Sequence, residues 1–454
     1  MNDWYRYIHK SFVFPLWSLW NGDNYKHEYK KIKSFCALPL ISMENLQRSA
    51  LRSVTCHAFE NVYYYQSLFN KLGINPYDIN TYEDFCQIPI LTKKELRLNI
   101  ELFIDANVDR DQLIKSGTGG TTDSPIPIYY DKARNKIKTA EMAYFREWFS
   151  WYPESKVAYL WGAPMDMPNM NSWKYCIRNK LLDRTLYLFA SMLNDEVMGC
   201  YIKQLNHFKP DIIQAYSNPM YILAKFILQR GISIVKPKAI IVTAELCSPA
   251  QQKIIEEAFN CSVLSFYGAR EAGYIAVQCA KEKNFHINTH GVFLEILRNN
   301  RPVKPGEIGD VVLTDLHNYT MPLIRYKIGD VASLDEKKCS CDCELPLLNF
   351  IAGRETDVFV TTDGDMIPGV SLCDRVVTDC SGFSQLQFIQ SKPEEILVKI
   401  VKGDKYTKQD MGNLDNILDE YFHGKVKIIK NYVDDIPKDK SGKTRFCISH
   451  VPLP

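Results

Sequence analysis

Short apolar runs alternate with amphipathic segments through the middle of the chain. The runs "DIIQAY", "KAIIVTAE" and "CSVLSFYG" have the length of buried strands, and "NPMYILAKFILQRG" and "SPAQQKIIEEAF" between them have helical spacing. Ser217 or Asn218 is the expected cap of the first helix and Gly231 its end, while Ser248 and Pro249 begin the second. This strand–helix–strand–helix–strand order predicts a parallel sheet in an α/β fold.

The pattern differs on either side of this region. Helical segments such as "MENLQRSALRSVTCHAFENV" dominate the first hundred residues, and "DVVLTDL" and "LIRYKIGDVASL" indicate further strands, which we expect to be antiparallel. Beyond "GRETD", the runs "EEILVKIVKGD", "MGNLDNILDEYF" and "GKVKIIKN" indicate a small α+β unit. We therefore predict a large N-terminal domain (1–354) with mixed and parallel sheets flanked by helices. A small mobile α+β domain (355–454) would follow it.

Composition and charge narrow the functional classes. The 454 residues are 46% hydrophobic and 24% charged, as in ordinary globular proteins, and exceed the size of one small core. The formal net charge of +2 gives no general attraction to nucleic acid or acidic surfaces. Function must therefore come from local sites.

The N-terminal run "SFVFPLWSLW" is too short to span a membrane, which takes about 20 apolar residues. No small-residue cleavage site follows it, so we expect an element packed on the body, with peripheral membrane association left open. The 14 cysteines are scattered, which indicates a reducing, cytoplasmic location and mostly free, buried thiols.

Candidate chemistry begins with "SGTGGTTDSPIPIYY", from Ser116 to Tyr130. A run of glycines and threonines is typical of a surface loop, and it is also typical of a phosphate cradle built from backbone N–H groups and hydroxyls. Polar tips "AYSN", "TAE" and "YGARE" follow the three buried strands. In parallel sheets ligands bind outside these carboxyl ends, so the tips should lie close together.

Six motifs in order make the cradle interpretation stronger. They are "TGGTTDSP", "TAE", "YGARE", "YTMPLIRYKIGD", "GRETD" and "PKDKSGKTR". Through these motifs and the segment "HFKPDIIQAYSNP", nearly the whole chain resembles the adenylate-forming (ANL) superfamily, in particular its CapK and phenylacetate–CoA ligase-like branch. Such enzymes join a carboxylate to the α-phosphate of ATP with Mg²⁺, release pyrophosphate, and pass the acyl group to a second nucleophile. Bringing two anions together requires positive charge and directed donors.

The resemblance implies a nucleotide site. Its phosphate-loop residues would be Ser116, Thr118, Gly119, Gly120, Thr121 and Thr122. Asp123 and Ser124 stand where the family usually has glycine and often lysine, which leaves the phosphate grip less complete. "SGKT" near the C-terminus is no Walker loop, since proline occupies the place of that motif's first glycine.

The same resemblance assigns the remaining nucleotide contacts. Ala244 and Glu245 would line the adenine side, Tyr267 would offer a ring face with Gly268 beside it, Asp330 would accept both ribose hydroxyls, and Arg354 would reach ribose or phosphate. A core aromatic at Tyr267 and a turn aspartate at Asp330 are the structural alternatives.

Three further residues would act in catalysis. Glu271 would hold Mg²⁺, and Lys443 on the mobile Ser-Gly turn would bridge carboxylate and α-phosphate when the small domain closes. Arg270 stands where the superfamily has a hydroxyl residue; it would contact the α-phosphate or merely pair with Glu271. Thr356 replaces the usual hinge aspartate, which carries little weight because hinges need no particular side chain.

A structural zinc site is also expected. Cys279, His286, Cys339 and Cys341 offer four ligands, and although their spacing is no standard finger, it resembles the pattern in this branch. Cys343 is an alternative ligand, and a cluster of free thiols is the structural alternative.

The substrate is less defined. Trp161, Met165, Tyr216 and Ser217 are the expected lining of the carboxylate pocket, unless they are ordinary core residues. Resemblance to phenylacetate–CoA ligases implies an aryl acid passed to coenzyme A. Resemblance to CapK implies capsule or other surface polysaccharide synthesis with an amine or sugar acceptor. A third alternative, a nucleotide-binding partner protein without catalysis, is disfavoured because Glu271, Asp330, Arg354 and Lys443 are all present.

Overall fold

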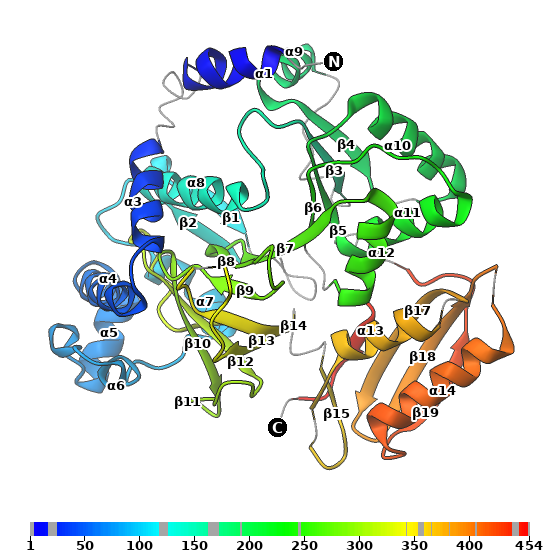
Figure 1. Ribbon diagram of the computed structural model, residues 1–454. Helices are drawn as coiled ribbons and strands as arrows, with labels where there is room; N and C mark the ends of the chain where they lie inside the picture. Colours follow the sequence, from blue (N-terminus) through cyan, green and yellow to red (C-terminus); the bar gives the residue numbers. More distant parts are fainter. Residues whose placement is uncertain are drawn as a thin grey trace. The chain divides into compact units, whose positions relative to one another are not determined.

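The chain folds as two compact units, drawn in Figure 1. The computed structural model describes residues 4–16, 25–117, 126–161, 172–190, 193–243, 247–341, 343–352, 358–364, 366–380, 382–404, 406–437 and 445–452. Unit 1 comprises Met1–Phe14, Pro153–Ser265 and Ala352–Pro454, and unit 2 comprises Pro15–Tyr152 and Phe266–Ile351.

Unit 1 contains the predicted parallel sheet. Its strands run in the order β4-β3-β5-β6-β7, and every neighbouring pair is parallel. They are β3 (Val157–Trp161), β4 (Thr185–Phe189), β5 (Ile212–Tyr216), β6 (Ala239–Thr243) and β7 (Ser262–Ala269), with helices α10 (Asp195–Phe208), α11 (Ser217–Arg230) and α12 (Pro249–Phe259). The last four residues of β7, from Phe266 on, belong to unit 2. The prediction of strand, helix, strand, helix, strand in this region is confirmed.

Local signals explain where these helices begin and end. Gly231 adopts φ +60° directly after α11, a left-handed conformation that glycine reaches without a Cβ penalty. Ser248 closes a capping box with Gln251 at the start of α12, and Pro249 occupies the first turn. Ser217 is the first residue of α11, so the cap of that helix is Tyr216 and not Ser217 or Asn218.

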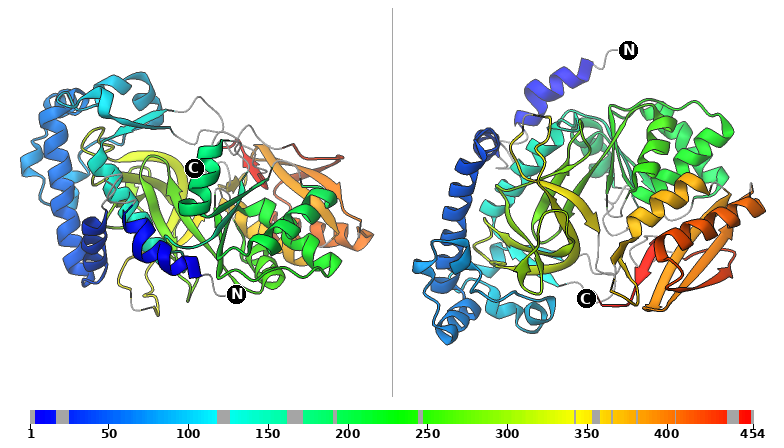
Figure 2. Two further views of the ribbon diagram at one scale, coloured as in Figure 1. Left: turned by 90° about the horizontal axis from the view of Figure 1, so that it is seen from above. Right: turned by 60° about the horizontal axis from the view of Figure 1, so that its bottom comes forward.

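The C-terminal part of unit 1 forms a second, four-stranded sheet in the order β19-β18-β17-β20. Helices α13 and α14 lie together on one of its faces (Figures 1 and 2). The elements are β15 (Val358–Val360), β16 (Met366–Pro368), α13 (Gly369–Asp379), β17 (Phe383–Lys392), β18 (Glu395–Lys402), α14 (Lys408–Phe422), β19 (Lys427–Tyr432) and β20 (Cys447–Ser449). They enclose a hydrophobic core of their own, as the predicted α+β unit requires. The boundary between 354 and 355 stays a prediction.

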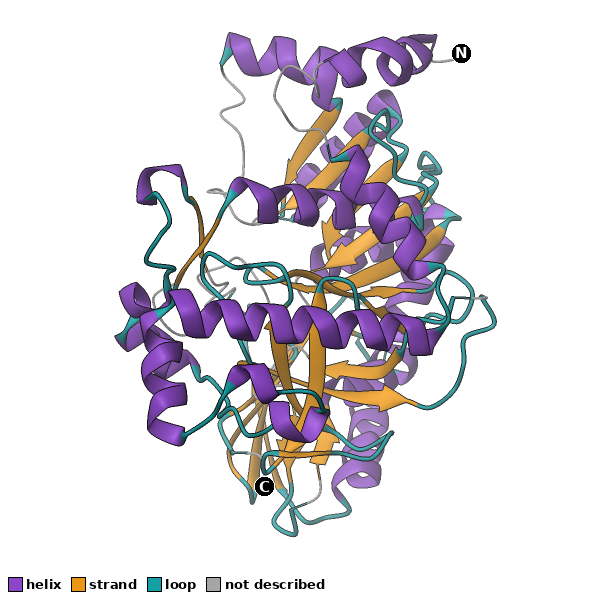
Figure 3. Ribbon diagram, turned by 90° about the vertical axis from the view of Figure 1, so that its left-hand side faces the viewer, coloured by secondary structure: helices purple, strands orange, loops and turns teal. Residues whose placement is uncertain are grey.

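Unit 2 packs helices against antiparallel strands. The helices are α3 (Lys26–Cys36), α4 (Leu40–Asn61), α5 (Tyr63–Leu72), α6 (Tyr82–Phe85), α7 (Lys93–Leu98) and α8 (Lys132–Glu147), with short 3₁₀ turns η2 (Pro76–Asp78), η3 (Ile100–Phe103) and η4 (Arg110–Gln112). The strands are β1 (Ile114–Gly117), β2 (Pro127–Tyr130), β8 (Gly273–Gln278), β9 (Phe285–Ile287), β10 (Val292–Arg298), β11 (Arg301–Pro302), β12 (Gly309–Asp315), β13 (Tyr326–Asp335) and β14 (Leu347–Ala352). β12 and β13 pair antiparallel, which confirms that expectation. Figure 3 shows helices of this unit in front of its strands.

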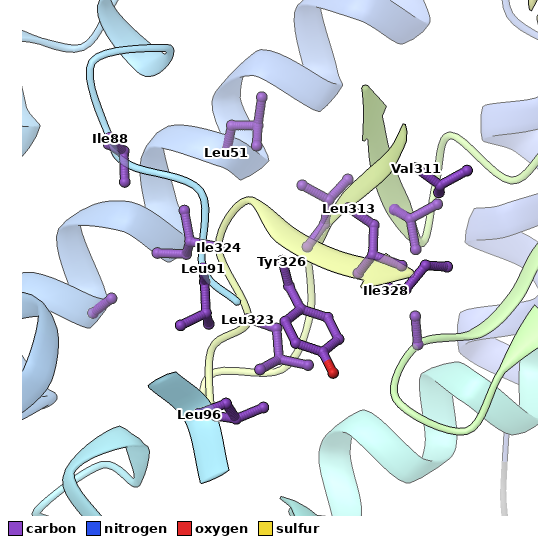
Figure 4. Packing of buried hydrophobic residues seen from close by; sticks show 14 of the residues in the cluster. Leu51, Ile88, Leu91, Leu96, Val311, Leu313, Leu323, Ile324, Tyr326 and Ile328 are labelled. Atoms are coloured by element: carbon purple, nitrogen blue, oxygen red, sulfur yellow. The ribbon is translucent and has the colours of Figure 1, made fainter. Parts of the chain in front are cut away.

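The core of unit 2 joins residues that are distant in sequence. Leu51 of α4, Ile88 and Leu96 pack with Leu313 and Tyr326 of the strands, and all five are buried (Figure 4). Burying each such side chain contributes roughly 1.5–3 kcal/mol. The helical segments from α4 to η3 are therefore part of the same core as the strands that follow residue 290.

The N-terminal segment lies in unit 1. It forms α1 (Trp4–Ile8) and the π-helical turn η1 (His9–Val13), which contact η6 (Asn179–Asp183), the continuation of α9 (Trp173–Arg178). Within the described residues, no helix combines the length and apolar character needed to cross a membrane.

The cysteines are free thiols, as expected, but their burial is not. Of the 14, only Cys36, Cys279, Cys373, Cys380 and Cys447 are buried. Two others are exposed and the rest are half-buried. The expectation of mostly buried thiols was wrong because burial depends on the three-dimensional surroundings of each cysteine, which spacing does not reveal.

A buried guanidinium ties three parts of unit 2 together. Arg325 donates from Nε and Nη2 to the two oxygens of Glu295, at 3.1 and 3.0 Å, and from Nη1 to the carbonyls of Cys86 and Ile88, at 2.7 and 2.6 Å. The Arg325 carbonyl in turn accepts the N–H of Leu91. Arg325 has φ +49°, an unusual value for a residue with a side chain, which these bonds hold in place.

A second buried guanidinium fixes α8. Arg134 donates to Asp315 at 3.0 Å, to Glu141 at 3.3 Å and to the Ala272 carbonyl at 2.9 Å. Glu141 also faces Nδ1 of His290 at 3.2 Å. Although burial by itself opposes ionisation, Arg134 and His290 lower the pKa of Glu141 to about 2.

Replacing Arg325 by methionine should destabilise the protein strongly. The change leaves the Glu295 carboxylate buried without its guanidinium, and breaking such a pair costs about 3–5 kcal/mol. The measurement is the midpoint of urea unfolding. Lys338→Met is the matched control: its pair with Glu344 has side chains 81% and 42% exposed, so its loss should cost less than about 1 kcal/mol. Equal losses in both variants would contradict the role given to Arg325.

Glu141 should make stability depend on acidity in a defined window. Its pKa in the folded protein lies below the ordinary value of 4.5, so its contribution is complete above pH 4.5 and disappears as pH falls toward 2. The unfolding free energy of wild type should exceed that of Glu141→Gln by about 3 kcal/mol near neutral pH, and the difference should shrink across this window. A difference that stays constant between pH 6 and pH 3 would show that Glu141 does not titrate as described.

Candidate functional site

Several predicted site residues lie outside the described part of the chain. They are Thr118, Gly119, Gly120, Thr121, Thr122, Met165, Ala244, Glu245, Arg354 and Lys443. The departures Asp123, Ser124 and Thr356 lie outside it as well. Their roles stay predictions.

The strands on either side of the glycine–threonine run are described. Ser116 in β1 pairs with Ile128 in β2, and Gly117 pairs with Pro127, in antiparallel register. The run from 118 therefore connects the two arms of a hairpin. The role of the run itself as a phosphate cradle stays a prediction.

Tyr267 and Asp330 meet in unit 2. The Tyr267 hydroxyl, at the end of β7, donates to Oδ2 of Asp330 in β13 at 2.7 Å. Burial, followed by the Asp330 charge, raises the pKa of Tyr267 well above its ordinary value, so the phenol keeps its proton. The sequence motifs "YGARE" and "KIGD" thus come together, although they are about sixty residues apart.

Gly268 has a structural reason to be glycine. A Cβ at this position would lie 2.7 Å from the Gly273 carbonyl oxygen, across an irregularity in the pairing of β7 with β8. Close approach of two backbone segments therefore requires glycine here. Room for an adenine ring, the role expected from the sequence, is a separate requirement that stays a prediction.

Glu271 is a buried carboxylate in the turn between β7 and β8. Its side chain is held in a largely desolvated place, and burial raises its pKa, while the charges of Lys93, Lys138 and Arg270 act in the opposite direction. Arg270 itself is exposed. A carboxylate among several cations suits a site where Mg²⁺ and phosphates are to bind.

Helix α8 positions this turn. Lys138 donates from Nζ to the Arg270 carbonyl at 3.2 Å, and Arg134 donates to the Ala272 carbonyl. Gly273, at φ +84°, leaves room for the Lys138 chain, whose Cε would lie 3.3 Å from a Cβ there. Two cations of one helix thus fix the backbone on both sides of Glu271.

Lys93 is a neighbour of the site that sequence reasoning missed. It is the first residue of α7, after the capping box formed by Thr92 and Glu95, and its Nζ would lie 3.2 Å from a Cβ built on Gly329, the residue before Asp330. The motif "TKKEL" could have revealed the start of the helix. It contains no signal that this lysine would lie beside β13, because that follows from pairing at Leu91 with Tyr326.

Three of the four residues proposed to line an acid pocket are described, and all three lie in unit 1. The rings of Trp161, at the end of β3, and Tyr216, at the end of β5, have centroids 4.6 Å apart. Tyr216 and Ser217 are 4% and 1% exposed, so both are packed in the interior. Tyr216 pairs with Thr243, so the ends of β5 and β6 lie side by side, as expected for polar strand tips.

The four expected zinc ligands come together. One donor atom from each of Cys279, His286, Cys339 and Cys341 lies within 4.8 Å of the others. Nε2 of His286 is 3.2 Å from the Cys341 sulfur, and Nδ1 of His286 is 3.2 Å from the Leu345 carbonyl. Donation from Nδ1 to that carbonyl leaves the Nε2 lone pair toward the cysteines, the orientation that zinc-binding histidines use.

This cluster also has suitable electrostatics. Although burial opposes it, backbone N–H groups lower the pKa of Cys279, which favours the thiolate that binds zinc. Burial raises the pKa of Cys343 to about 11, and Cys343 does not belong to the group of four. The donor set therefore fits a tetrahedral structural ion, with Cys341 and not Cys343 as the fourth ligand.

A second group of possible ligands was not anticipated. Glu141, His290 and His317 also offer donor atoms within 4.8 Å of one another. Arg134 already neutralises Glu141, and Nε2 of His317 contacts the His290 carbonyl at 2.9 Å. Burial lowers the pKa of His317 to about 4, so it stays neutral near pH 7. We interpret this group as a structural hydrogen-bond network that holds α8 against the strands of unit 2.

Comparison with known proteins agrees with these features. Residues 359–450 match the family model of the CapK C-terminal domain. The chain is 27% identical to protein CapK of Staphylococcus aureus over 442 residues, which covers 94% of this chain and 93% of that protein. It is 23% identical to a phenylacetate–coenzyme A ligase of Thermus thermophilus, over 73% of this chain and 74% of the ligase.

A solved structure shows the same fold. A 2-hydroxyisobutyryl-CoA ligase in complex with an acyl-AMP compound superposes with a TM-score of 0.74 at 17% identity, covering 91% of both chains. Residues 359–450 thus match the CapK C-terminal domain, the chain is similar to CapK along nearly its whole length, and it has the fold of an acyl-CoA ligase; these findings support the resemblance to the CapK and phenylacetate–CoA ligase-like branch of the adenylate-forming enzymes.

Proposed function

We propose that the protein activates a carboxylic acid with ATP and transfers the acyl group to coenzyme A, an amine or a sugar in the synthesis of capsule or another surface polysaccharide. A carboxylate oxygen of the acid would attack the α-phosphorus, and the bond to the pyrophosphate oxygen would break. The acceptor would then attack the acyl carbon and AMP would leave. The similarity to CapK along nearly the whole chain, including the C-terminal domain, is the observation that carries this proposal.

The described residues of unit 2 are chemically suited to the first step. The Asp330 carboxylate, oriented by Tyr267, can accept ribose hydroxyls. Glu271 would hold Mg²⁺, which supplies charge neutralisation for the phosphates when bound. Lys93 and Lys138 add positive charge near Glu271, as a reaction between two anions requires.

The residues outside the described part complete the proposal. The loop Thr118–Thr122 would close over the β- and γ-phosphates, Ala244 and Glu245 would line the adenine, and Arg354 would contact ribose or phosphate. Lys443 would bridge carboxylate and α-phosphate. The acid would lie against Trp161, Met165, Tyr216 and Ser217, and the reaction would take place in the cytoplasm.

Two alternative functions can be distinguished from the proposed one by experiment. Similarity to phenylacetate–CoA ligases, over about three quarters of the chain, favours an aryl acid and coenzyme A. A nucleotide-binding partner protein would bind ATP without forming an adenylate. Exchange supported by an aryl acid would favour the phenylacetate–CoA ligase type. ATP binding without exchange for any acid would favour the non-catalytic partner protein.

ATP–pyrophosphate exchange measures the proposed first step directly. Against a panel of aryl, fatty, amino and sugar acids, one class should support exchange. Lys443→Ala should lower that exchange by about a hundredfold or more, since it removes a charge that acts mainly in the transition state. Lys440→Ala, on the same segment, is the matched control and should keep nearly full exchange. A protein that binds no ATP at all would overturn the proposal.

We also propose that Cys279, His286, Cys339 and Cys341 bind a structural zinc ion. The purified protein should contain about one zinc ion per chain, and Cys341→Ser should lose it and melt at a lower temperature. Cys343→Ser, two residues away and outside the cluster, should keep both the metal and the melting temperature. Elemental analysis and thermal unfolding measure the two effects. Zinc retained by Cys341→Ser would rule out this ligand set.

A further inference from the structure

Two helical segments of unit 1 expose an apolar surface. It consists of Tyr7, Ile8 and Phe12 from α1–η1 and Trp173, Ile177 and Leu181 from α9–η6, and we name it the N-terminal surface. Their exposed fractions are 73%, 39%, 64%, 68%, 52% and 46%. Large apolar side chains that are singly exposed need no explanation, but six on two adjoining segments mark an interaction site.

The two segments are held together as one surface. The Tyr5 hydroxyl donates to the Leu181 carbonyl at 2.8 Å, and Nε2 of His9 lies 2.9 Å from the Leu182 carbonyl. His9 is fully buried, and Arg6 donates to Asp211 at 3.3 Å. Figure 1 shows α1 beside α9. The exposed side chains therefore belong to a docked element and not to a free tail.

The surface is basic, although the chain as a whole is nearly neutral. Segments 4–16 and 172–183 contain five Lys and Arg residues and one acidic residue. The cations are Arg6, Lys10, Lys174, Arg178 and Lys180, and the acid is Asp183. Some of this charge is balanced locally, because Arg178 pairs with Asp183 at 3.1 Å, Arg6 pairs with Asp211 at 3.3 Å and Lys10 lies 3.9 Å from Glu154. Lys10, Lys174 and Lys180 are exposed, and Nζ of Lys174 lies 5.8 Å from the centroid of the Trp173 ring.

We propose that the N-terminal surface docks the protein on an anionic lipid bilayer. Aromatic side chains with an apolar body favour the headgroup level of a membrane, and neighbouring lysines are attracted to anionic lipids. The segments lie along the interface, since they are too short to span it. A second copy of the chain is a poorer occupant, because a two-fold interface would place the same cations against each other.

Sedimentation with vesicles tests this proposal on the full-length protein. Vesicles of phosphatidylcholine with phosphatidylglycerol should bind it, vesicles of phosphatidylcholine alone should bind at least about tenfold less, and raising the salt concentration should weaken binding. Phe12→Glu and Trp173→Glu should each reduce binding to the anionic vesicles at least about tenfold, since each places a charge where an aromatic ring would be buried.

Leu98→Glu is the matched control. Leu98 is 71% exposed and lies on α7 in unit 2, so the same substitution there should leave vesicle binding unchanged. Thermal unfolding of each variant shows whether it is folded, as expected for exposed positions. Binding that is equal with and without anionic lipid, or unchanged in Phe12→Glu and Trp173→Glu, would overturn the proposal. Concentration-dependent dimers that Phe12→Glu abolishes, without vesicle binding, would assign the surface to a second copy instead.

Discussion

The buried guanidinium of Arg325 is the constraint on which the arrangement of unit 2 depends. Its donors bind a carboxylate of β10 and two carbonyls of the segment before α7. A buried arginine without such partners would be very costly, so the three segments can only fold with their ends together. That juxtaposition pairs Leu91 with the start of β13 and thereby brings Lys93 to Gly329. The position of a cation next to Asp330 is thus a consequence of one ion pair in the core.

Arg134 is a second buried guanidinium that holds segments of unit 2 together. It neutralises Glu141 and Asp315 while one donor remains for the Ala272 carbonyl. The turn that contains Glu271 is therefore fastened to a helix whose own position is set by buried charge. Burial raises the pKa of Glu271, and nearby cations act in the opposite direction. The hydrogen bonds from α8 fix the backbone that carries this side chain. Such preorganisation is what an anion-binding site requires, since the donors need not be rearranged when the ligand arrives.

The fold could be predicted where its causes are local. Ser248, Pro249 and Gly231 mark helix ends because caps and left-handed turns act over a few residues, and the buried strands are visible as short apolar runs. The cysteine–histidine group was predictable through resemblance, although nothing in its spacing fixes the geometry. Lys93 and the His290–Glu141 contact were not predictable, because each joins segments that are distant in the chain. The requirement for glycine at position 268 was not predictable either, because it arises from close contact with the backbone of the neighbouring strand.

Charge is distributed unevenly, and this explains how a nearly neutral chain can act on anions. The net charge of +2 arises from 55 basic and 53 acidic residues, so any excess of one sign must be local. Around Glu271 the lysines come from α7 and α8, two helices separated by a hairpin, and on the N-terminal surface the cations come from segments more than 150 residues apart. In both places tertiary structure gathers positive charge that the sequence disperses. Physiological salt screens exposed charges over about 8 Å, so each local excess of positive charge acts mainly on ligands close to it. The proposed nucleotide site and the proposed lipid-binding surface therefore need no strong overall charge on the chain.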